Sequence, residues 1–514
     1  MKNWHSRLEM LLFPIKILFV AVILQGIGNL AYNPIITSVF AFDNEIIVSI
    51  FMVLRYIGNF IITNFPLLIL IKMVGRRQDS STPIFAAVLG YIVFISTCSF
   101  VAYKGFSSEF YYSILGISVN MSDFVEGSKL ILKPFQMGVI ASIVMIYITR
   151  FSYRLTRKHN NNFLAYMDRD TTCFILTMTL SVVGGILLSV VWPVVISLIE
   201  SIMLSLAGDI SNPINLFWYG IFDRVMSLLG LSSISQTAFW FGSYGGSWLD
   251  ANGVNFLGDI NIWTAQSSNL IVSAGAGRLI TPYYILNFFA IPGVILVMWN
   301  IITKKEERRK LIPFVLIAIS VSVLFGSLLP FELFLLVTAP VLFGIHLVCT
   351  GFLFAILQIT EIFVGYTYIG SPAYAAPGGF FDWLPYFNDT VTKTNLLLFV
   401  AIGVATFAFY IFVTYIYFNY LALDVMNIKK RDVVNNLLLS VGGVGNIINI
   451  HSSYDKVTIS VLNSKVVNFD ILHDCGIGRI VENRDGFNIY FGSDSFMIRR
   501  ELIKTIKGEL SGKK

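Results

Sequence analysis

Residues 173–206 read CFILTMTLSVVGGILLSVVWPVVISLIESIMLSL, a run of 34 residues with one charged side chain, Glu200. About 20 apolar helical residues cross the hydrocarbon core of a bilayer, so this stretch is long enough to span a membrane. Similar stretches recur along residues 1–425, with shorter apolar pieces between them. The longer ones are residues 11–34, 46–71, 83–102, 131–149, 283–302, 311–329, 333–357 and 395–420. We therefore predict an α-helical polytopic membrane protein with eight to ten spans.

The composition of the 514-residue chain agrees with this prediction. Hydrophobic residues make up 56% of the chain and charged residues 13%, and the mean hydropathy is +0.74. These values lie outside the range of water-soluble globular proteins. The net charge is only +6, and no dense basic cluster lies outside the apolar stretches, so we expect no nucleic-acid binding. The first stretch, residues 11–34, is too long for a signal peptide and lacks a small-residue cleavage site, so we expect it to be retained.

Charge density divides the chain near residue 425. Of the 66 charged residues (36 basic plus 30 acidic), 44 lie in residues 1–425 and 22 in the 89 residues 426–514. The charged fraction therefore rises from about 10% to about 25%, and the second value is normal for soluble domains. We predict a membrane domain over residues 1–425 and a small α/β domain over residues 426–514. Its expected elements are helices over residues 433–441 and 496–506 and strands over residues 456–462 and 487–491.

The four cysteines, Cys98, Cys173, Cys349 and Cys475, are scattered and form no CxxC pair. This spacing favours neither a disulfide framework nor a zinc site. We expect four reduced structural thiols, no bound metal and no cofactor.

Basic residues gather at every second interruption between the apolar stretches. Cytoplasmic loops of membrane proteins carry an excess of lysine and arginine, so we expect both termini and the C-terminal domain to be cytoplasmic. The residues concerned are Lys2, Arg7, Lys72, Arg76, Arg77, Arg150, Arg154, Arg157, Lys158, Arg169, Lys304, Lys305, Arg308, Arg309, Lys310, Lys429, Lys430 and Arg431.

Two segments do not have the pattern of plain spans. Residues 211–282 mix apolar runs with several glycines and contain Asp223, Arg224 and Arg278, and residues 371–383 form a second break rich in glycine and proline. Non-helical backbone at membrane depth occurs where it is buried in protein or lines a wet cavity. A charged group there is costly unless it has a partner, which favours re-entrant hairpins around a substrate site. The alternative is two large external loops.

Short motifs occur in a fixed order along the membrane region. They are Phe13-Pro14 with Gly26–Asn29, Asp223-Arg224, Gly230-Leu231, Phe239–Phe241 with Gly258-Asp259, Ala276–Arg278, Pro292-Gly293, and Ala339–Leu342 with Ile345-His346. Their order and spacing resemble the glucose-type sugar permeases of the bacterial phosphotransferase system, in which a membrane-embedded IIC domain is fused to a cytoplasmic IIB domain. The resemblance implies a homodimer in the bacterial cell membrane. Such a protein takes a sugar into a pocket, and its IIB domain, supplied by phosphocarrier proteins, phosphorylates the sugar.

Three groups that perform this chemistry in the family are replaced in the matching positions. The family reads Gly-Leu-His-His where this chain has Gly230-Leu231-Ser232-Ser233, and a serine hydroxyl is no base at neutral pH. The family reads Gly-Ile-Thr-Glu-Pro-Ile-Glu-Phe where residues 326–333 read GSLLPFEL, so the first glutamate is Leu329 and only Glu332 remains. In the tail, Ser453 stands in the place of the phosphorylated cysteine, and an unactivated serine is a poor nucleophile.

Three functions remain open. The first is a permease that moves a small polar solute such as a sugar without phosphorylating it, which makes a role for phosphocarrier partners doubtful. The second is a receptor or immunity-type membrane protein that binds a solute without moving it. The third is an active phosphotransferase with an unusual acceptor. The expected solute contacts are Arg278, Glu332, Ser232, Ser233 and Arg224.

Two of these residues have structural alternatives. Arg278 could instead close an ion pair with Asp223, Asp259 or Glu332 inside the bundle. Glu332 could instead accept a hydrogen bond from a backbone amide or pair with an arginine. No catalytic residue is expected, because Ser453 occupies the phospho-acceptor position.

Overall fold

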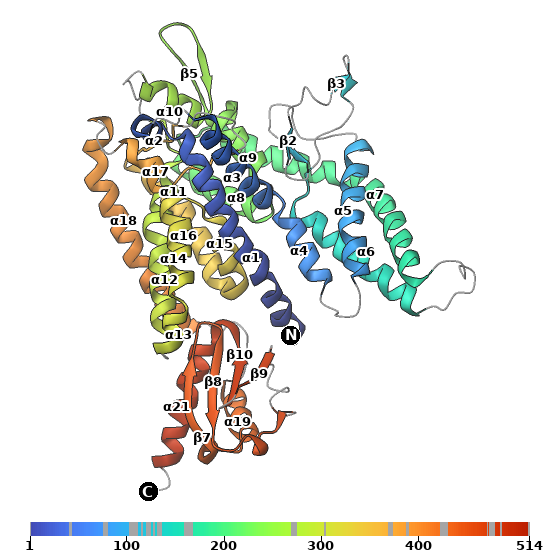
Figure 1. Cartoon of the computed structure of the whole chain (residues 1–514). Coiled ribbons are helices and arrows are strands. Elements are labelled where there is room, and N and C mark those ends of the chain that lie inside the picture. The colour runs from blue at the N-terminus through green and yellow to red at the C-terminus, as the bar shows by residue number, and fades with distance from the viewer. Residues whose placement is uncertain are drawn as a thin grey trace.

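The computed structural model places most of the chain in helices (Figure 1). It describes residues 2–40, 44–75, 81–101, 112–114, 117–119, 125–126, 129–130, 136–158, 168–268, 275–302, 305–367, 374–386, 390–421, 430–469, 471, 479–483 and 486–511. The predicted boundary at residues 425/426, Arg76, Arg77, Lys304, Lys429 and Cys475 lie outside these ranges.

Eight helical segments within the described residues are long and apolar enough to cross a membrane, which confirms the predicted fold class. They lie in α1 (Lys2–Asn29), α3 (Glu45–Thr63), α5 (Thr82–Val101), α6 (Val139–Lys158), α7 (Arg169–Ala207), α11 and α12 (Thr281–Ile285 and Ile291–Ile301), α16 (Pro340–Ile359) and α18 (Thr390–Ile416).

Shorter helices and strands complete the membrane body. The helices are α2 (Pro34–Val39), α4 (Phe65–Val74), α8 (Pro213–Leu228), α9 (Ser232–Gln236), α10 (Asp259–Ser268), α13 (Lys305–Lys310), α14 (Ile312–Ile319), α15 (Leu329–Thr338) and α17 (Phe380–Trp383). The strand pairs are β1 (Tyr112–Ile114) with β2 (Ile117–Val119), β3 (Val125–Glu126) with β4 (Lys129–Leu130), and β5 (Ser247–Leu249) with β6 (Asn255–Leu257).

Several predicted spans are broken where a proline begins a new helix. The stretch 46–71 divides at Asn64 into α3 and α4, and Pro66 lies in the first turn of α4. The stretch 333–357 divides at Ala339, because Pro340 begins α16. Proline lacks a backbone N–H and fits best in the first turn of a helix, so the predictions of continuous spans were wrong at these two positions. Pro14 and Pro193, by contrast, lie inside α1 and α7.

The sixth helix also differs from its predicted span, residues 131–149. α6 begins at Val139 and continues to Lys158, so Arg150, Arg154 and Arg157 lie on its last turns and not in a loop. Arg157 lies in the last turn, where a cation interacts favourably with the helix dipole. Arg150 Nη2 also donates a hydrogen bond to the carbonyl oxygen of Met73 at 2.6 Å.

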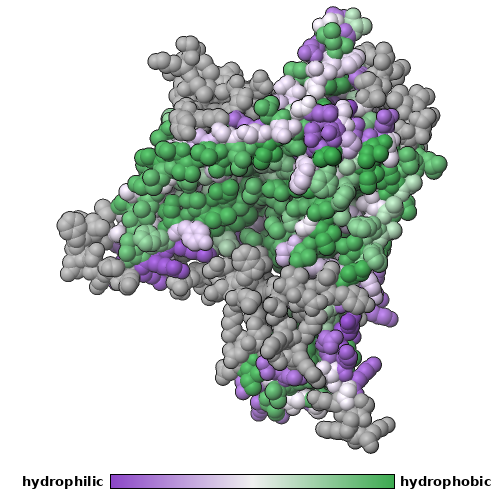
Figure 2. Space-filling view, turned by 180° about the vertical axis from the view of Figure 1, so that it is seen from behind, coloured by the Kyte–Doolittle hydropathy of each residue, from purple (hydrophilic) through white to green (hydrophobic). Residues whose placement is uncertain are grey.

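The helices of the body form two packed groups (Figure 1). α5, α6 and α7 pack together with α4, and α1, α3, α8, α12, α15, α16 and α18 form the larger group. Val183, Leu187, Val190, Val194 and Leu198 are exposed along α7, as expected for a helix that faces lipid. Figure 2 shows the resulting belt of hydrophobic side chains across the body, with hydrophilic side chains beyond it.

The segment that was predicted to be re-entrant has two parts. α8 has 16 residues, about 24 Å of helix, which is too short to cross the membrane. The chain turns after it at Gly230, whose φ is +72°, and enters α9. The β5–β6 pair instead extends outward from the end of the body opposite the C-terminal region (Figure 1). The re-entrant hairpin stays a prediction for residues 213–241, which supply a short helix and a turn, and the external loop stays a prediction for β5–β6.

The C-terminal region has a hydrophobic core of its own. An antiparallel sheet in the order β7-β8-β10-β9 packs with α19 (Lys430–Ser440) and α21 (Ser495–Ser511). Its strands are β7 (Ile447–Ser452), β8 (Lys456–Val461), β9 (Arg479–Asn483) and β10 (Gly486–Tyr490). The two predicted helices and two predicted strands are confirmed. Neither β7 nor β9 was predicted. In β7, an irregularity at Ile447–Asn449 shifts the register and hides the alternation of apolar residues.

This region lies on the same side of the body as the beginning of α1 and as the basic helix α13 (Figure 1). The turn between β7 and β8 meets the body there, where the Tyr454 ring lies 6.0 Å from the Phe334 ring of α15. The apolar cavity that receives Tyr454 is lined by residues of α12, α14 and α15. Burial raises the pKa of the Tyr454 hydroxyl above its ordinary value.

Candidate functional site

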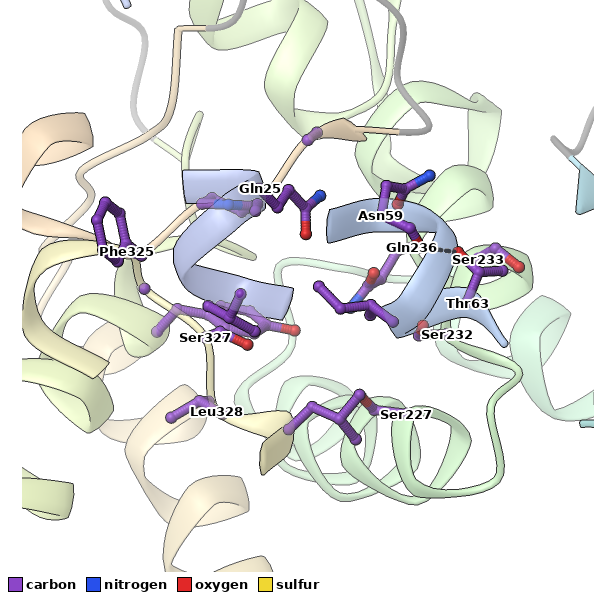
Figure 3. Close-up of a pocket in the computed structure, with 18 of the residues that line it drawn as sticks. Gln25, Asn59, Thr63, Ser227, Ser232, Ser233, Gln236, Phe325, Ser327 and Leu328 are labelled. Atoms are coloured by element: carbon purple, nitrogen blue, oxygen red, sulfur yellow. Dashed lines mark hydrogen bonds between the residues drawn. The ribbon is translucent and has the colours of Figure 1, made fainter. Parts of the chain in front are cut away.

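A cavity of about 190 Å³ lies inside the membrane body, where α1, α3, α8 and α9 approach the segments 325–329 and 375–377 (Figure 3). This volume corresponds to roughly six water molecules in the liquid, and a single hexose ring with its hydroxyls has about that size. The polar side chains that line it are Gln25, Asn59, Thr63, Arg224, Ser227, Ser232, Ser233, Gln236, Thr237, Tyr283 and Ser327. Trp240, Phe241, Phe325 and Phe65 add aromatic surface.

The first wall of the cavity depends on the turn at Gly230. The backbone N–H of Leu231 donates to the carbonyl oxygen of Met226 at 2.8 Å, which closes α8 and allows α9 to begin at Ser232. Ser233 Oγ donates to Gln136 Oε1 at 3.0 Å. The turn therefore brings Ser232, Ser233 and Gln236 to the cavity together.

The second wall depends on Gly326, which ends the interrupted helix before α15. Its φ is +68°, and a Cβ atom here would lie 2.3 Å from the Gly379 nitrogen. Asn287 Nδ2 donates to the Gly326 carbonyl oxygen at 3.0 Å and holds the turn. This backbone conformation, which glycine adopts without strain, places Phe325 and Ser327 at the cavity.

Three side-chain amides line the cavity and are available to bind a ligand. Within the described part of the chain, the amides of Gln25, Asn59 and Gln236 make no hydrogen bond to other protein groups. Figure 3 shows Gln25 and Ser327 on one side of the space and Asn59, Thr63 and Gln236 on the other. Each amide offers both donors and an acceptor, and this combination suits a neutral ligand with several hydroxyl groups.

A buried charge cluster continues behind the cavity wall. Arg224 is the one charged residue among the described residues that line the cavity. It donates through Nε and Nη2 to Asp223 Oδ2 and through Nη2 to the Tyr283 hydroxyl at 2.8 Å. Its Nη1 lies 3.6 Å from Glu332 Oε1. Glu332 Oε1 lies 3.2 Å from His346 Nε2, and His346 Nδ1 lies 2.8 Å from the Tyr410 hydroxyl. Ion pairing of this kind is what allows charges to stay inside a membrane protein.

The structure brings some of the sequence-predicted residues together and separates others. Arg224, Ser232 and Ser233 line the cavity, and Glu332 lies behind Arg224. Arg278 lies away from the cavity. Its guanidinium donates to the carbonyl oxygens of Gly275 (2.6 Å) and Ile210 (3.0 Å) and to Ser211 Oγ (2.7 Å).

Sequence reasoning missed Gln25, Asn59 and Gln236. The signal was present for the first two, since each is a polar side chain inside an apolar stretch, and such residues commonly face a cavity or the bundle interior. Gln236 had no comparable signal, because it follows a short segment already rich in serine.

No group of three or more metal-ligating side chains occurs among the residues that the structure describes. Cys98 and Cys173 are buried and Cys349 is half-buried, and these three thiols are free. Ser453 lies in the turn between β7 and β8, is 3% exposed, and its backbone N–H donates to the Lys456 carbonyl oxygen at 2.8 Å.

A multi-pass membrane body that encloses a cavity lined by hydroxyls and amides defines a permease for a polar solute. Residues 8–351, about two-thirds of the chain, match the family model described as phosphotransferase system, EIIC. The chain belongs to this family of sugar-transporting membrane permeases. The predicted resemblance is thereby confirmed at the level of the EIIC permease.

Proposed function

We propose that this protein is a glucose-type EIIC permease that moves a neutral sugar across the bacterial cell membrane without phosphorylating it. The observation that carries the proposal is the lining of the cavity, where the described residues offer hydroxyls, amides and one arginine but neither a histidine nor a carboxylate. Ser232 and Ser233 line it where related permeases have histidines, and Leu329 lines it where they have a glutamate. Such a lining binds sugar hydroxyls but contains no general base to activate one.

The proposal treats the C-terminal region as a IIB-like domain that has lost its phospho-acceptor. Ser453, which aligns with the family cysteine, is buried beside Tyr454, and Tyr454 packs against the membrane body. A buried serine hydroxyl is a weak nucleophile, and access for a phosphocarrier protein is poor in this position. We also propose the domain boundary at residues 425/426 and cytoplasmic termini. The C-terminal region lies on the same side of the body as the basic helix α13, and this arrangement supports the orientation. We also propose a homodimer, which only the resemblance to the family supports.

The test is counterflow in proteoliposomes that contain the purified full-length protein. The probes are radiolabelled glucose, mannose and N-acetylglucosamine, each measured with and without the phosphotransferase coupling proteins. We expect counterflow of at least one hexose without the coupling proteins, and no sugar phosphate with them. Binding without counterflow would favour a receptor, and label on the C-terminal region would favour an active phosphotransferase.

Replacement of Ser453 by Ala is expected to leave counterflow unchanged. If the hydroxyl carries no phosphoryl group, its removal deletes no step of transport, and alanine fits the space that the buried serine occupies. The initial rate of exchange in proteoliposomes measures the effect. Complete loss of uptake in Ser453→Ala, with normal protein yield, would count against transport without phosphorylation.

Replacement of Asn59 by Leu is expected to weaken sugar binding by about 5- to 150-fold. The substitution removes the amide, so a sugar hydroxyl that leaves water to enter the cavity no longer finds a hydrogen-bond partner there. This loss weakens binding by about 1–3 kcal/mol. Isothermal titration with the transported hexose measures the dissociation constant. Asn252→Leu, in the exposed turn between β5 and β6, is the control and should bind as the wild type does. Equal affinity of both variants would place the sugar elsewhere.

A further inference from the structure

The cluster behind the cavity is unbalanced in charge. Asp223, Arg224, Glu332 and His346 are 0%, 3%, 0% and 2% exposed. With both carboxylates ionised and His346 neutral, two negative charges face one positive charge, so the cluster carries a net charge of −1. An uncompensated charge in a low-dielectric interior costs several kcal/mol, and one proton removes it.

Among the described residues, the other titratable groups around the cluster do not supply the missing positive charge. Tyr283 on α11 and Tyr410 on α18 interact with Glu332, Tyr219 on α8 interacts with Asp223, and Cys349 on α16 interacts with Tyr410. Tyr454 packs on Phe334 of α15. Phenols and thiols are uncharged at neutral pH. α1 also packs against α15, and its buried positions 15, 18, 19 and 22 are apolar while Lys16 is exposed.

The geometry offers a place for the proton. Glu332 Oε1 is shared by Arg224 and His346, whereas Glu332 Oε2 is buried and has no hydrogen-bond partner among the described residues. His346 can donate from Nε2 to Glu332 while Nδ1 accepts from the Tyr410 hydroxyl. A proton on Oε2 makes the cluster neutral without moving any other group. A proton on Nδ1 of the imidazole does so as well, provided that the Tyr410 hydroxyl rotates its hydrogen away and accepts from Nδ1.

We propose that the Glu332–His346 pair is a proton-binding site that couples proton movement to sugar movement. The proposal rests on the proposed function, because a permease that does not phosphorylate its sugar needs another source of energy to accumulate it. Arg224 and Tyr283 belong both to the cluster and to the cavity lining, so one pair of side chains joins the two sites. The coupled step is binding of one proton from solution together with one sugar, and release of both on the opposite side.

The coupling runs through Arg224. Its contact with Glu332, at 3.6 Å, is longer than its contacts with Asp223, so Glu332 is the more weakly held partner. A sugar hydroxyl that accepts from Nη1 competes with Glu332 for the guanidinium. The carboxylate then loses counter-charge and binds a proton more tightly, and by linkage the proton strengthens sugar binding to the same extent.

The test uses wild-type and Glu332→Gln protein in proteoliposomes with the transported hexose, an acidic exterior and the membrane potential clamped at zero. For one proton per sugar, an inward gradient of one pH unit supports up to about tenfold accumulation. We expect the wild type to accumulate sugar toward that ratio and to acidify an internal pH dye in a sugar-dependent manner. Glu332→Gln, which holds the site in a proton-like neutral form, should give an accumulation ratio of about one.

Counterflow separates failure of this inference from failure of the proposed function. Glu332→Gln is expected to retain counterflow at a reduced rate, which also shows that the variant is folded. Glu200→Gln, a matched carboxylate on α7, should accumulate as the wild type does. Wild-type counterflow without accumulation or a dye signal would overturn proton coupling and leave the permease standing, as would full accumulation by Glu332→Gln. Absence of wild-type counterflow for every hexose would overturn both.

Discussion

Replacement of Arg224 by Met is expected to abolish sugar counterflow and to lower the free energy of unfolding by about 3–5 kcal/mol, since removal of one partner leaves buried charges uncompensated. Asp223 loses the Nε and Nη2 donors and Glu332 loses its nearest cation. The Tyr283 hydroxyl also donates a hydrogen bond to Asp223, and this bond would remain after the arginine is lost. The same change removes the one charged group that the described residues contribute to the cavity lining.

Thermal unfolding of the detergent-purified protein and counterflow in proteoliposomes measure the two effects. Arg224→Lys retains the charge but not the planar fork of donors, so it should restore much of the stability and little of the transport. Arg278→Met is the comparison, because Arg278 lies away from the cavity and donates hydrogen bonds to backbone carbonyl oxygens and to Ser211. It should lower stability without changing sugar affinity. Normal transport by Arg224→Met, or loss of affinity in Arg278→Met with intact folding, would show that the cavity residues are misassigned.

Replacement of Gly326 by Ala is expected to abolish sugar binding by separating the two segments that form one wall of the cavity. The left-handed conformation alone costs about 1–2 kcal/mol in an L-residue. The new Cβ would in addition lie 2.3 Å from the Gly379 nitrogen and 2.5 Å from the Gly378 carbonyl carbon. These are backbone atoms and cannot rotate away, so Phe325 and Ser327 must shift from the cavity.

The dissociation constant for the transported hexose and the melting temperature measure this effect. Gly344→Ala is the matched control, because Gly344 lies inside α16 with no atom within 4 Å of the added methyl group. That change should be neutral or slightly stabilising, since alanine is the better helix former. Unaltered sugar affinity in Gly326→Ala would show that the wall tolerates displacement of this turn.

The sequence alone predicted the features that depend on local pattern. Apolar stretches such as residues 173–206 predicted the membrane helices, because the bilayer demands about 20 apolar residues wherever they fall along the chain. The rise in charge after residue 425 indicated the C-terminal region with its own core. Ordered short motifs indicated the family, which the match over residues 8–351 confirms. The breaks at Asn64 and Ala339 were missed because prolines inside long apolar runs were read as part of the spans.

Only the tertiary structure decided which polar residues share a site. Arg224 and Arg278 were equivalent candidates in the sequence. In the structure Arg224 lines the cavity, whereas Arg278 donates a hydrogen bond to the Gly275 carbonyl oxygen. Glu332 and His346 lie on α15 and α16, and Arg224 comes from α8, more than a hundred residues earlier in the chain. Their meeting depends on how helices pack against one another, and helix packing depends on side-chain surfaces distant in sequence, which no local pattern records.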